Sequence, residues 1–210
     1  MSNPILQRLI QHKAVPVVKI ESAAHADGLG KALLKGDLPV AEITFRTDAA
    51  AKSINILAEK HPDILVGAGT IINPEQAEKA IKAGARFIVC PGYTDEVVEY
   101  CRKRHILVVP GVATPTEVQY GLSKGIQLFK LFPAEISGGV RLLDSLRGPF
   151  PQVQFIPTGG INMDNAADYM RRENVIAVGG SWMVPSDLIA IEDWDSITRL
   201  AQLALQAVQA

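Results

Sequence analysis

Gln127-Leu128-Phe129-Lys130-Leu131-Phe132-Pro133-Ala134 places a single lysine inside an otherwise apolar run. The run is typical of a buried β-strand that ends at Pro133, and the alternation of side chains puts Leu128, Lys130 and Phe132 on one face. Both faces are apolar, so Lys130 has no evident route to bulk water. Because desolvation disfavours an ammonium ion, a buried lysine either pairs with a carboxylate or loses its proton. This strand alone leaves a structural ion pair, a snorkelling side chain and a Schiff-base nucleophile open.

Similar apolar runs recur roughly every 20 to 25 residues along the chain, and amphipathic stretches follow them, as in βα units. The runs span residues 15–20, 39–45, 64–69, 86–91, 106–110, 126–132, 153–157 and 175–178. Helical patterns include residues 49–60, 74–83, 95–104, 116–123, 140–146 and 194–208. Eight strands that alternate with helices predict a (β/α)8 TIM barrel, with an extra N-terminal helix near residues 3–10.

An open, doubly wound sheet is the competing fold, because it shows the same alternation of strands and helices. No glycine-rich dinucleotide turn follows the first run, where Lys19-Ile20-Glu21-Ser22 stands instead. No linker or low-complexity segment divides the chain. We therefore expect residues 1–210 to form one barrel domain.

The composition limits the possible partners. The 210 residues are 48% hydrophobic and 20% charged, with a formal net charge of -1, which argues against a nucleic-acid partner. No run predicts a signal peptide or a membrane span. Cys90 and Cys101 form no CxxC motif and predict reduced thiols in a cytoplasmic protein. The four histidines show no metal-ligand spacing, so we expect no metal and no catalytic histidine.

Polar residues on the second run point to a site at the carboxyl ends of the strands, where barrel enzymes have their active sites. Glu42, Thr44 and Arg46 share one face, while the opposite face is apolar and should contact the helices. This pattern favours Glu42 as a general acid/base and Arg46 as a clamp for a carboxylate or phosphate. A structural Glu–Arg pair at the rim is the alternative.

Glycine pairs after the seventh and eighth runs predict a phosphate site. Gly159-Gly160 follows Thr158, and Gly179-Gly180 precedes Ser181. Loops at these places in a barrel commonly bind phosphate through backbone N–H groups, although ordinary tight turns remain an alternative. The small residues before Thr70 also let a ligand approach the backbone closely.

Together these motifs resemble the 2-keto-3-deoxy-6-phosphogluconate/4-hydroxy-2-oxoglutarate (KDPG/KHG) aldolases, a family of class I pyruvate aldolases. The resemblance runs from near Pro16 to Ser186. The matching segments are Glu42-Ile43-Thr44-Phe45-Arg46-Thr47, Val66-Gly67-Ala68-Gly69-Thr70, Phe129-Lys130-Leu131-Phe132-Pro133-Ala134-Glu135, Pro157-Thr158-Gly159-Gly160 and Gly179-Gly180-Ser181-Trp182.

The resemblance implies a carbon–carbon lyase of the Entner-Doudoroff pathway that acts on a phosphorylated keto acid through a lysine imine, without a metal or other cofactor. Lys130 would form the imine with the C2 ketone, and Glu42 would carry protons. Arg46 and Thr70 would hold the pyruvate carboxylate. The other implied substrate contacts are Pro91, Phe132, Thr158, Gly159, Gly160, Gly179, Gly180 and Ser181. Members of the family are homotrimers, which we expect for this chain as well.

Two other functions fit parts of the pattern. A phosphosugar isomerase or epimerase on the same barrel would share the phosphate loops and use Glu42 as a base. A non-catalytic phosphosugar-binding protein would have no need of an ionisable pair inside the barrel, so Glu42 and Lys130 argue against it.

Overall fold

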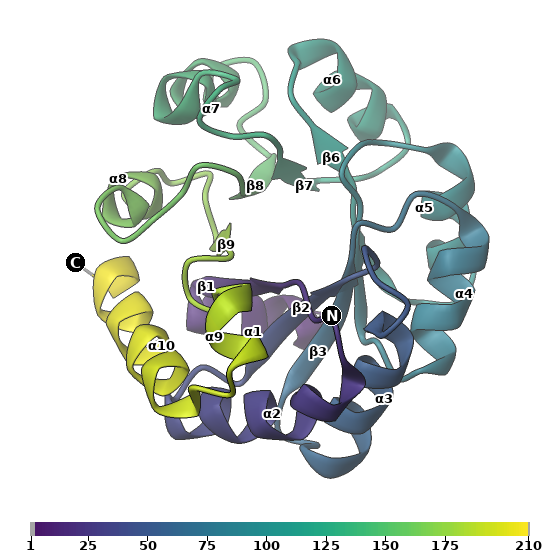
Figure 1. Cartoon of the computed structure of the whole chain (residues 1–210). Helices are drawn as coiled ribbons and strands as arrows, with labels where there is room; N and C mark the ends of the chain where they lie inside the picture. The colour runs from purple at the N-terminus through teal and green to yellow at the C-terminus, as the bar shows by residue number, and fades with distance from the viewer. Residues whose placement is uncertain (1–2, 210) are drawn as a thin grey trace.

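The structure is a computed structural model that describes residues 3–209. Six strands form one sheet in the order β5-β4-β3-β2-β1-β9, three form a second in the order β6-β7-β8, and every pairing is parallel. Figure 1 shows the strands of the two sheets arranged in a ring around a central axis, with α2 to α8 and α10 outside them. The strands are β1 (Ala14–Val18), β2 (Val40–Thr44), β3 (Leu65–Gly69), β4 (Phe87–Val89), β5 (Leu107–Val109), β6 (Gly111–Val112), β7 (Leu128–Leu131), β8 (Gln154–Pro157) and β9 (Val178–Gly180). The predicted α/β class with a curved parallel sheet is confirmed.

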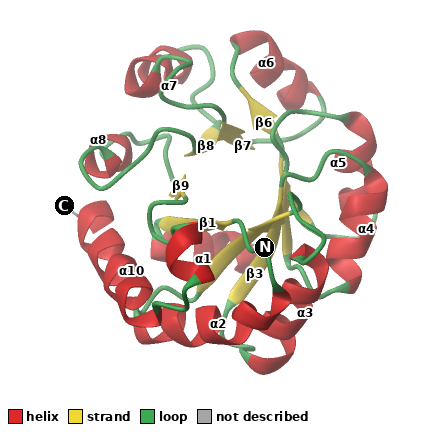
Figure 2. Ribbon diagram, viewed as in Figure 1, coloured by secondary structure: helices red, strands yellow, loops and turns green. Residues whose placement is uncertain are grey.

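The helices alternate with these strands (Figure 2). Several begin at the capping residues that the sequence offers: Asn3 accepts hydrogen bonds at the start of α1, and Thr114 forms a capping box with Glu117 at the start of α6. The helices are α1 (Pro4–His12), α2 (Ala26–Lys35) with the short 3-10 helix η1 (Ala23–His25) before it, α3 (Ala50–Lys60), α4 (Pro74–Lys82), α5 (Asp95–Arg102), α6 (Pro115–Ser123), α7 (Gly139–Arg147), α8 (Ala166–Met170), α9 (Ser186–Ala190) and α10 (Trp194–Gln209).

The strands differ most from the predicted runs in two places. The fifth run, predicted at 106–110, forms β5, and a separate short strand, β6, follows Pro110, because proline has no N–H to donate to the ladder. The carbonyl of Pro110 still accepts a hydrogen bond of 2.9 Å from the backbone N–H of Lys130. The eighth run, predicted at 175–178, contributes β9 at Val178–Gly180, where pairing with β1 begins. Before that point Val175 forms only an isolated bridge, to Phe155.

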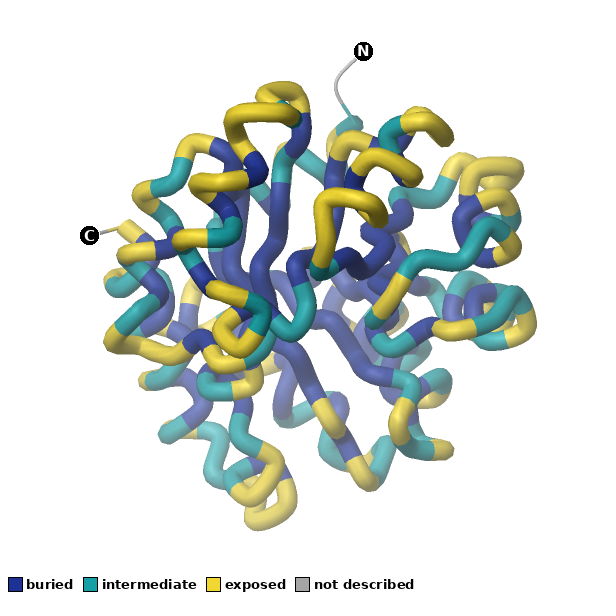
Figure 3. The backbone as a smooth tube through the Cα atoms, turned by 90° about the horizontal axis from the view of Figure 1, so that it is seen from above, coloured by how far each residue is buried: buried dark blue, intermediate teal, exposed yellow. Residues whose placement is uncertain are grey.

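The apolar residues form two cores, one between the strands and the helices and one inside the ring of strands. Figure 3 shows the strands buried and the outer helical turns exposed. The inner core holds Leu9 of α1 together with residues from strands all around the ring, namely Val15, Val40, Leu65, Phe87, Val89, Val109, Leu128, Ile156, Ile176 and Ala177. Helix α1 therefore packs against the inside of the ring, near the amino ends of the strands.

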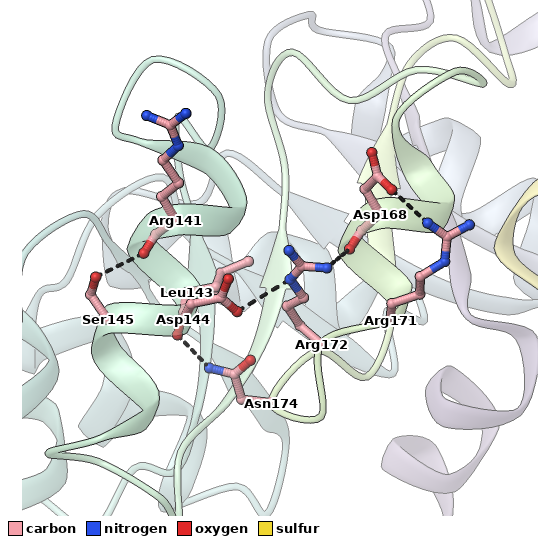
Figure 4. Close-up of polar contacts among 8 residues, drawn as sticks. All are labelled: Arg141, Leu143, Asp144, Ser145, Asp168, Arg171, Arg172 and Asn174. Carbon is pink, nitrogen blue, oxygen red and sulfur yellow. Dashed lines mark hydrogen bonds and ion pairs between the residues drawn. The ribbon is translucent and has the colours of Figure 1, made fainter.

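A polar network joins α7 to the segment that follows α8 (Figure 4). Arg172 Nε donates to Asp144 Oδ1 at 3.2 Å, and Asn174 Nδ2 donates to the carbonyl of Leu143 at 2.9 Å. These contacts fix the chain just before it enters β9. Within residues 3–209, no helix has the length and apolar character needed to cross a membrane.

Candidate active site

Lys130 and Glu42 meet inside the ring, at the carboxyl ends of β7 and β2. Lys130 Nζ lies 3.4 Å from Glu42 Oε1, and the two side chains are only 4% and 3% exposed. The ammonium group also lies 5.1 Å from the centroid of the Phe132 ring. The carboxylate compensates the buried positive charge and at the same time puts a proton acceptor beside the amine.

The neighbouring backbone is shaped to admit Glu42. A Cβ atom on Gly69 would lie 2.1 Å from Glu42 Oε1, so only glycine leaves room for the carboxylate. On the same strand, the hydroxyl of Thr44 donates to the carbonyl of Val18 at 2.8 Å, which ties β2 to β1. Glu42 is thus held in place by its surroundings.

Arg46 stands at the mouth of the ring and is exposed. Its Nε donates to Thr70 Oγ1 at 3.0 Å. Thr70 has a positive φ of 59°, a conformation that places its side chain off the end of β3. The structure therefore brings together two residues that the sequence predicted to act as a pair.

A cavity of about 180 Å³ opens between the ends of β1, β2, β7, β8 and β9, and it contains much of the predicted site. Seven of its lining residues were predicted to contact substrate: Arg46, Phe132, Thr158, Gly159, Gly160, Gly180 and Ser181. The hydroxyl of Thr158 is buried and has no hydrogen-bond partner among residues 3–209. Such an atom is suited to a ligand that supplies the missing partner.

Five predicted residues do not line this cavity. Lys130 lies next to a lining residue, with its Nζ 5.1 Å from the centroid of the Phe132 ring, and Glu42 is paired with Lys130. Thr70 contacts the lining through its hydrogen bond with Arg46. Gly179 packs beneath Thr158, since a Cβ on Gly179 would lie 2.3 Å from the threonine Oγ1. Pro91 follows β4 and packs against Gly111, so the structure does not bring it to this cavity.

The sequence reasoning missed Val17 and Lys19, which line the cavity from β1 and the residues after it. Their position at the carboxyl end of the first strand could have indicated them, because the carboxyl ends of all the strands face the same site. Thr44 on β2 and Ile161, directly after the glycine pair, also line the cavity and were not predicted to contact substrate.

The loop with the first glycine pair is anchored to the segment that follows Lys130. Gly159 and Gly160 have φ values of 99° and 80°, and the carbonyl of Gly159 accepts a 3.1 Å hydrogen bond from the N–H of Glu135. The carboxylate of Glu135 in turn accepts a hydrogen bond from the buried hydroxyl of Tyr169 on α8. Burial and this hydrogen bond raise the pKa of Tyr169. The catalytic strand and the glycine loop are thereby joined directly.

The remaining ionisable groups near the site give no second centre. Across residues 3–209, no cluster of three or more His, Cys, Asp or Glu is arranged to hold a metal ion. Cys90 and Cys101 are free and buried, and burial raises the pKa of each thiol to about 12. Because the thiolate is the nucleophilic form, neither cysteine is activated for attack.

The fold and the site together define an α/β protein with a parallel curved sheet, whose buried lysine–carboxylate pair and glycine loops lie at the carboxyl ends of the strands. This is the place where barrel enzymes carry out their chemistry. A buried lysine beside a proton acceptor is the arrangement that Schiff-base enzymes require.

The family model of KDPG and KHG aldolase matches residues 5–200, and the chain belongs to this family. The KHG/KDPG aldolase of Escherichia coli (strain K12) is 40% identical over 195 residues, which cover 93% of this chain and 92% of that protein. A structure of KDPG aldolase from Legionella pneumophila, with pyruvate captured at low pH as a covalent carbinolamine intermediate, has a TM-score of 0.93 and 40% identity, covering 96% of this chain and 98% of that one. KDPG aldolase of Zymomonas mobilis ZM4 with 3-phosphoglycerate has a TM-score of 0.89 and 37% identity, covering 96% and 94% of the two chains.

Proposed function

We propose that this protein is a class I, metal-independent aldolase that cleaves 2-dehydro-3-deoxy-6-phosphogluconate into pyruvate and glyceraldehyde 3-phosphate. It also cleaves 4-hydroxy-2-oxoglutarate into pyruvate and glyoxylate. The observation that carries the proposal is the buried pair of Lys130 and Glu42, with 3.4 Å between Nζ and Oε1. The Legionella relative, in which pyruvate is captured as a carbinolamine, supports the same chemistry.

In the first stage, Lys130 transfers a proton to Glu42, and the uncharged amine attacks the C2 ketone, whose oxygen takes that proton back from Glu42 to become the hydroxyl of a carbinolamine. Glu42 accepts the proton that the amine gives up and returns one to the departing hydroxyl, which leaves as water. The product is a protonated imine, which draws electrons from the neighbouring C3–C4 bond.

In the second stage, Glu42 takes the proton of the C4 hydroxyl, partly through a water molecule. The C3–C4 bond breaks, its electron pair forms an enamine with the imine, and C4 leaves as the aldehyde. Glu42 then returns its proton to C3, which becomes the methyl group of pyruvate. Water hydrolyses the imine, releases pyruvate and restores Lys130.

The other side chains hold the substrate. Arg46, oriented by Thr70, binds the pyruvate carboxylate, and Phe132 packs against the pyruvyl methyl group. Thr158 offers its unpartnered hydroxyl to a substrate hydroxyl. The backbones of Gly159, Gly160, Gly179 and Gly180, with Ser181, bind the distal phosphate. Pro91, in the turn that follows β4, is a further substrate contact.

We further propose that residues 1–210 form one domain, a closed (β/α)8 barrel with α1 as the extra N-terminal helix. The inner core, to which strands all around the ring contribute, and the bridge from Thr158 to Gly179 support closure. The protein acts as a cytoplasmic homotrimer, has a small phosphorylated keto acid as its partner, and needs no metal or nucleic acid.

Reduction with borohydride in the presence of pyruvate tests this function. The intact protein should gain the mass of a reduced pyruvyl group on Lys130, and Lys130→Ala should gain none and release no pyruvate. An isomerase or epimerase would leave the mass unchanged. A labelled adduct that persists in Lys130→Ala would refute the assignment, and loss of turnover on treatment with EDTA would refute metal independence.

A further inference from the structure

The cavity of about 180 Å³ adjoins a second one of about 590 Å³ that extends toward α9. Five residues line both cavities and therefore mark the junction between them: Lys19, Arg46, Gly160, Ile161 and Ser181. The junction combines two cationic side chains with a hydroxyl group and glycine backbone. No carboxylate lines the inner cavity, and the one carboxylate in the lining of the outer cavity, Asp187, is not among the residues of the junction.

The pairing of β1 with β9 explains why Lys19 reaches this junction. Val15 pairs with Gly179, and Pro16 pairs with Gly180. Along β1, Val17 and then Lys19 share one face, and both line the inner cavity. Lys19 directly follows β1, and Ser181 directly follows the neighbouring strand β9. The pairing of these two strands therefore brings Lys19 close to Ser181.

The two cations of the junction differ in their contacts. Arg46 is oriented by its 3.0 Å hydrogen bond to Thr70, at the end of β3. Lys19 Nζ lies 2.7 Å from Glu21 Oε1, and the side chains of this pair are 50% and 62% exposed. An exposed ion pair on flexible side chains contributes little, so Lys19 can exchange Glu21 for a more highly charged partner.

We propose that Lys19 binds the distal anionic group of the substrate at the junction of the two cavities, and that Glu21 holds the lysine there until an anion replaces it. This division assigns Arg46 to the carboxylate end of the substrate and Lys19 to the other end. Lys19 thus determines specificity by favouring a distal phosphate over an uncharged hydroxyl. The identity of the substrate rests on the proposed function, whereas anion binding at Lys19 does not.

Binding of inorganic phosphate, measured by titration calorimetry on the whole protein, tests the anion site without turnover. Lys19→Met keeps the aliphatic stem and removes the charge, and it should weaken phosphate binding by about tenfold. Lys19→Arg should restore most of the affinity. Lys82→Met is the matched control, because the Lys82–Glu78 pair is also exposed and 2.7 Å long but lies on α4, outside both cavities. Equal phosphate affinity in the wild type and Lys19→Met would overturn the proposal.

Turnover then tests specificity. For Lys19→Met, kcat/KM on 2-dehydro-3-deoxy-6-phosphogluconate should fall about tenfold relative to the same keto acid without its phosphate, mainly through KM. Glu21→Gln should lower KM for the phosphorylated substrate, because it removes the competing carboxylate. A ratio of the two substrates unchanged from the wild type would refute the role of Lys19 in specificity. A loss of phosphate binding in Lys19→Met, together with a wild type that releases no pyruvate, would refute the proposed reaction and leave the anion site standing.

Discussion

The lower and upper parts of the ring interior are built from the same strands but differ in chemistry. At successive inward positions, an apolar residue is followed two residues later by a polar one. The pairs are Val40 and Glu42 on β2, Leu128 and Lys130 on β7, and Ile156 and Thr158 at the end of β8. All six are buried.

This contrast separates stability from function within one interior. The lower layer packs apolar side chains against α1, which gains stability from burial. The upper layer buries an ammonium and a carboxylate, whose desolvation opposes their mutual attraction. Residues that serve the chemistry therefore occupy positions that the fold itself would fill better with apolar side chains.

Replacing the charged lysine of the upper layer by an apolar side chain should have the largest effect on activity. Lys130→Met should lower kcat by about 10⁵-fold or more, because it removes the nucleophile. It should also cost about 3 kcal/mol of unfolding free energy, since Glu42 is left buried and unpaired. The double variant with Glu42→Gln should recover most of that stability but no activity. Pyruvate release and urea denaturation at a fixed protein concentration measure both effects.

A double variant no more stable than Lys130→Met would show that the pair is not coupled. Glu42→Gln alone supplies the fourth corner of this double-mutant cycle. If the effects of the two single substitutions on the unfolding free energy simply add in the double variant, Lys130 and Glu42 do not interact, and the proposed energetic difference between the two layers is wrong.

Breaking the lower layer should have the opposite pattern. Leu9→Ala removes a fully buried side chain that joins α1 to the inner core, and it should cost about 2–5 kcal/mol of unfolding free energy. The kcat of the folded protein should change little, because the void that the substitution leaves lies at the amino ends of the strands, away from the catalytic residues at their carboxyl ends. Ile191→Ala, at a position that is 72% exposed, is the control. If Leu9→Ala instead lowered kcat as strongly as it lowered stability, the two layers would not be separable.

Gly69→Ala tests the upper layer without altering any charged group. The new Cβ would fall 2.1 Å from Glu42 Oε1 and force the carboxylate to move. We expect kcat to fall by about 10²-fold, since a displacement near 1 Å disturbs catalytic geometry by that order. Gly92→Ala is the matched control, because a Cβ there meets nothing within 4 Å. Equal rates for both variants would mean that Gly69 does not set the position of Glu42.

The sequence was sufficient to predict those features of the upper layer that depend on the local pattern of residues. The alternation along 126–132 predicted a buried Lys130, and that along 39–45 placed Glu42 on the face away from the helices, because the period of a strand is fixed; both side chains are buried and lie next to each other. The glycine pairs that border the cavity were likewise evident. The short strand β6 after Pro110 was missed, since the Pro110-Gly111 pair at its start is typical of a turn. Lys19 was missed because its nearness to Ser181 depends on pairing between the first and last strands.

The outer core offers a smaller and pH-dependent effect. Burial raises the pKa of the Cys90 thiol from 9.0 to about 12, so folding favours the protonated form. The associated stability is fully present below about pH 9 and is lost as the pH rises toward the folded-state value, because the unfolded thiol ionises first. Between pH 8 and pH 10 the wild type should lose about 1 kcal/mol more unfolding free energy than Cys90→Ala. Urea denaturation at the two pH values measures this difference, and identical losses would refute the shift.

The smallest effect should come from the contact that joins the two functional ends of the upper layer. Tyr169→Phe removes the hydroxyl that donates to Glu135 and leaves the packing of the ring intact. Glu135 supports the carbonyl of Gly159 from the segment that follows Lys130, so the glycine loop should lose part of its restraint. We expect KM for the phosphorylated substrate to rise about threefold with kcat unchanged, the pattern of lost uniform binding. Tyr120→Phe removes a similar hydroxyl-to-carboxylate contact, with Asp95, away from both cavities, and should leave KM as it is. If kcat fell instead, Tyr169 would affect the position of Lys130 rather than that of the glycine loop, and substrate binding and catalysis in the upper layer could not be changed separately.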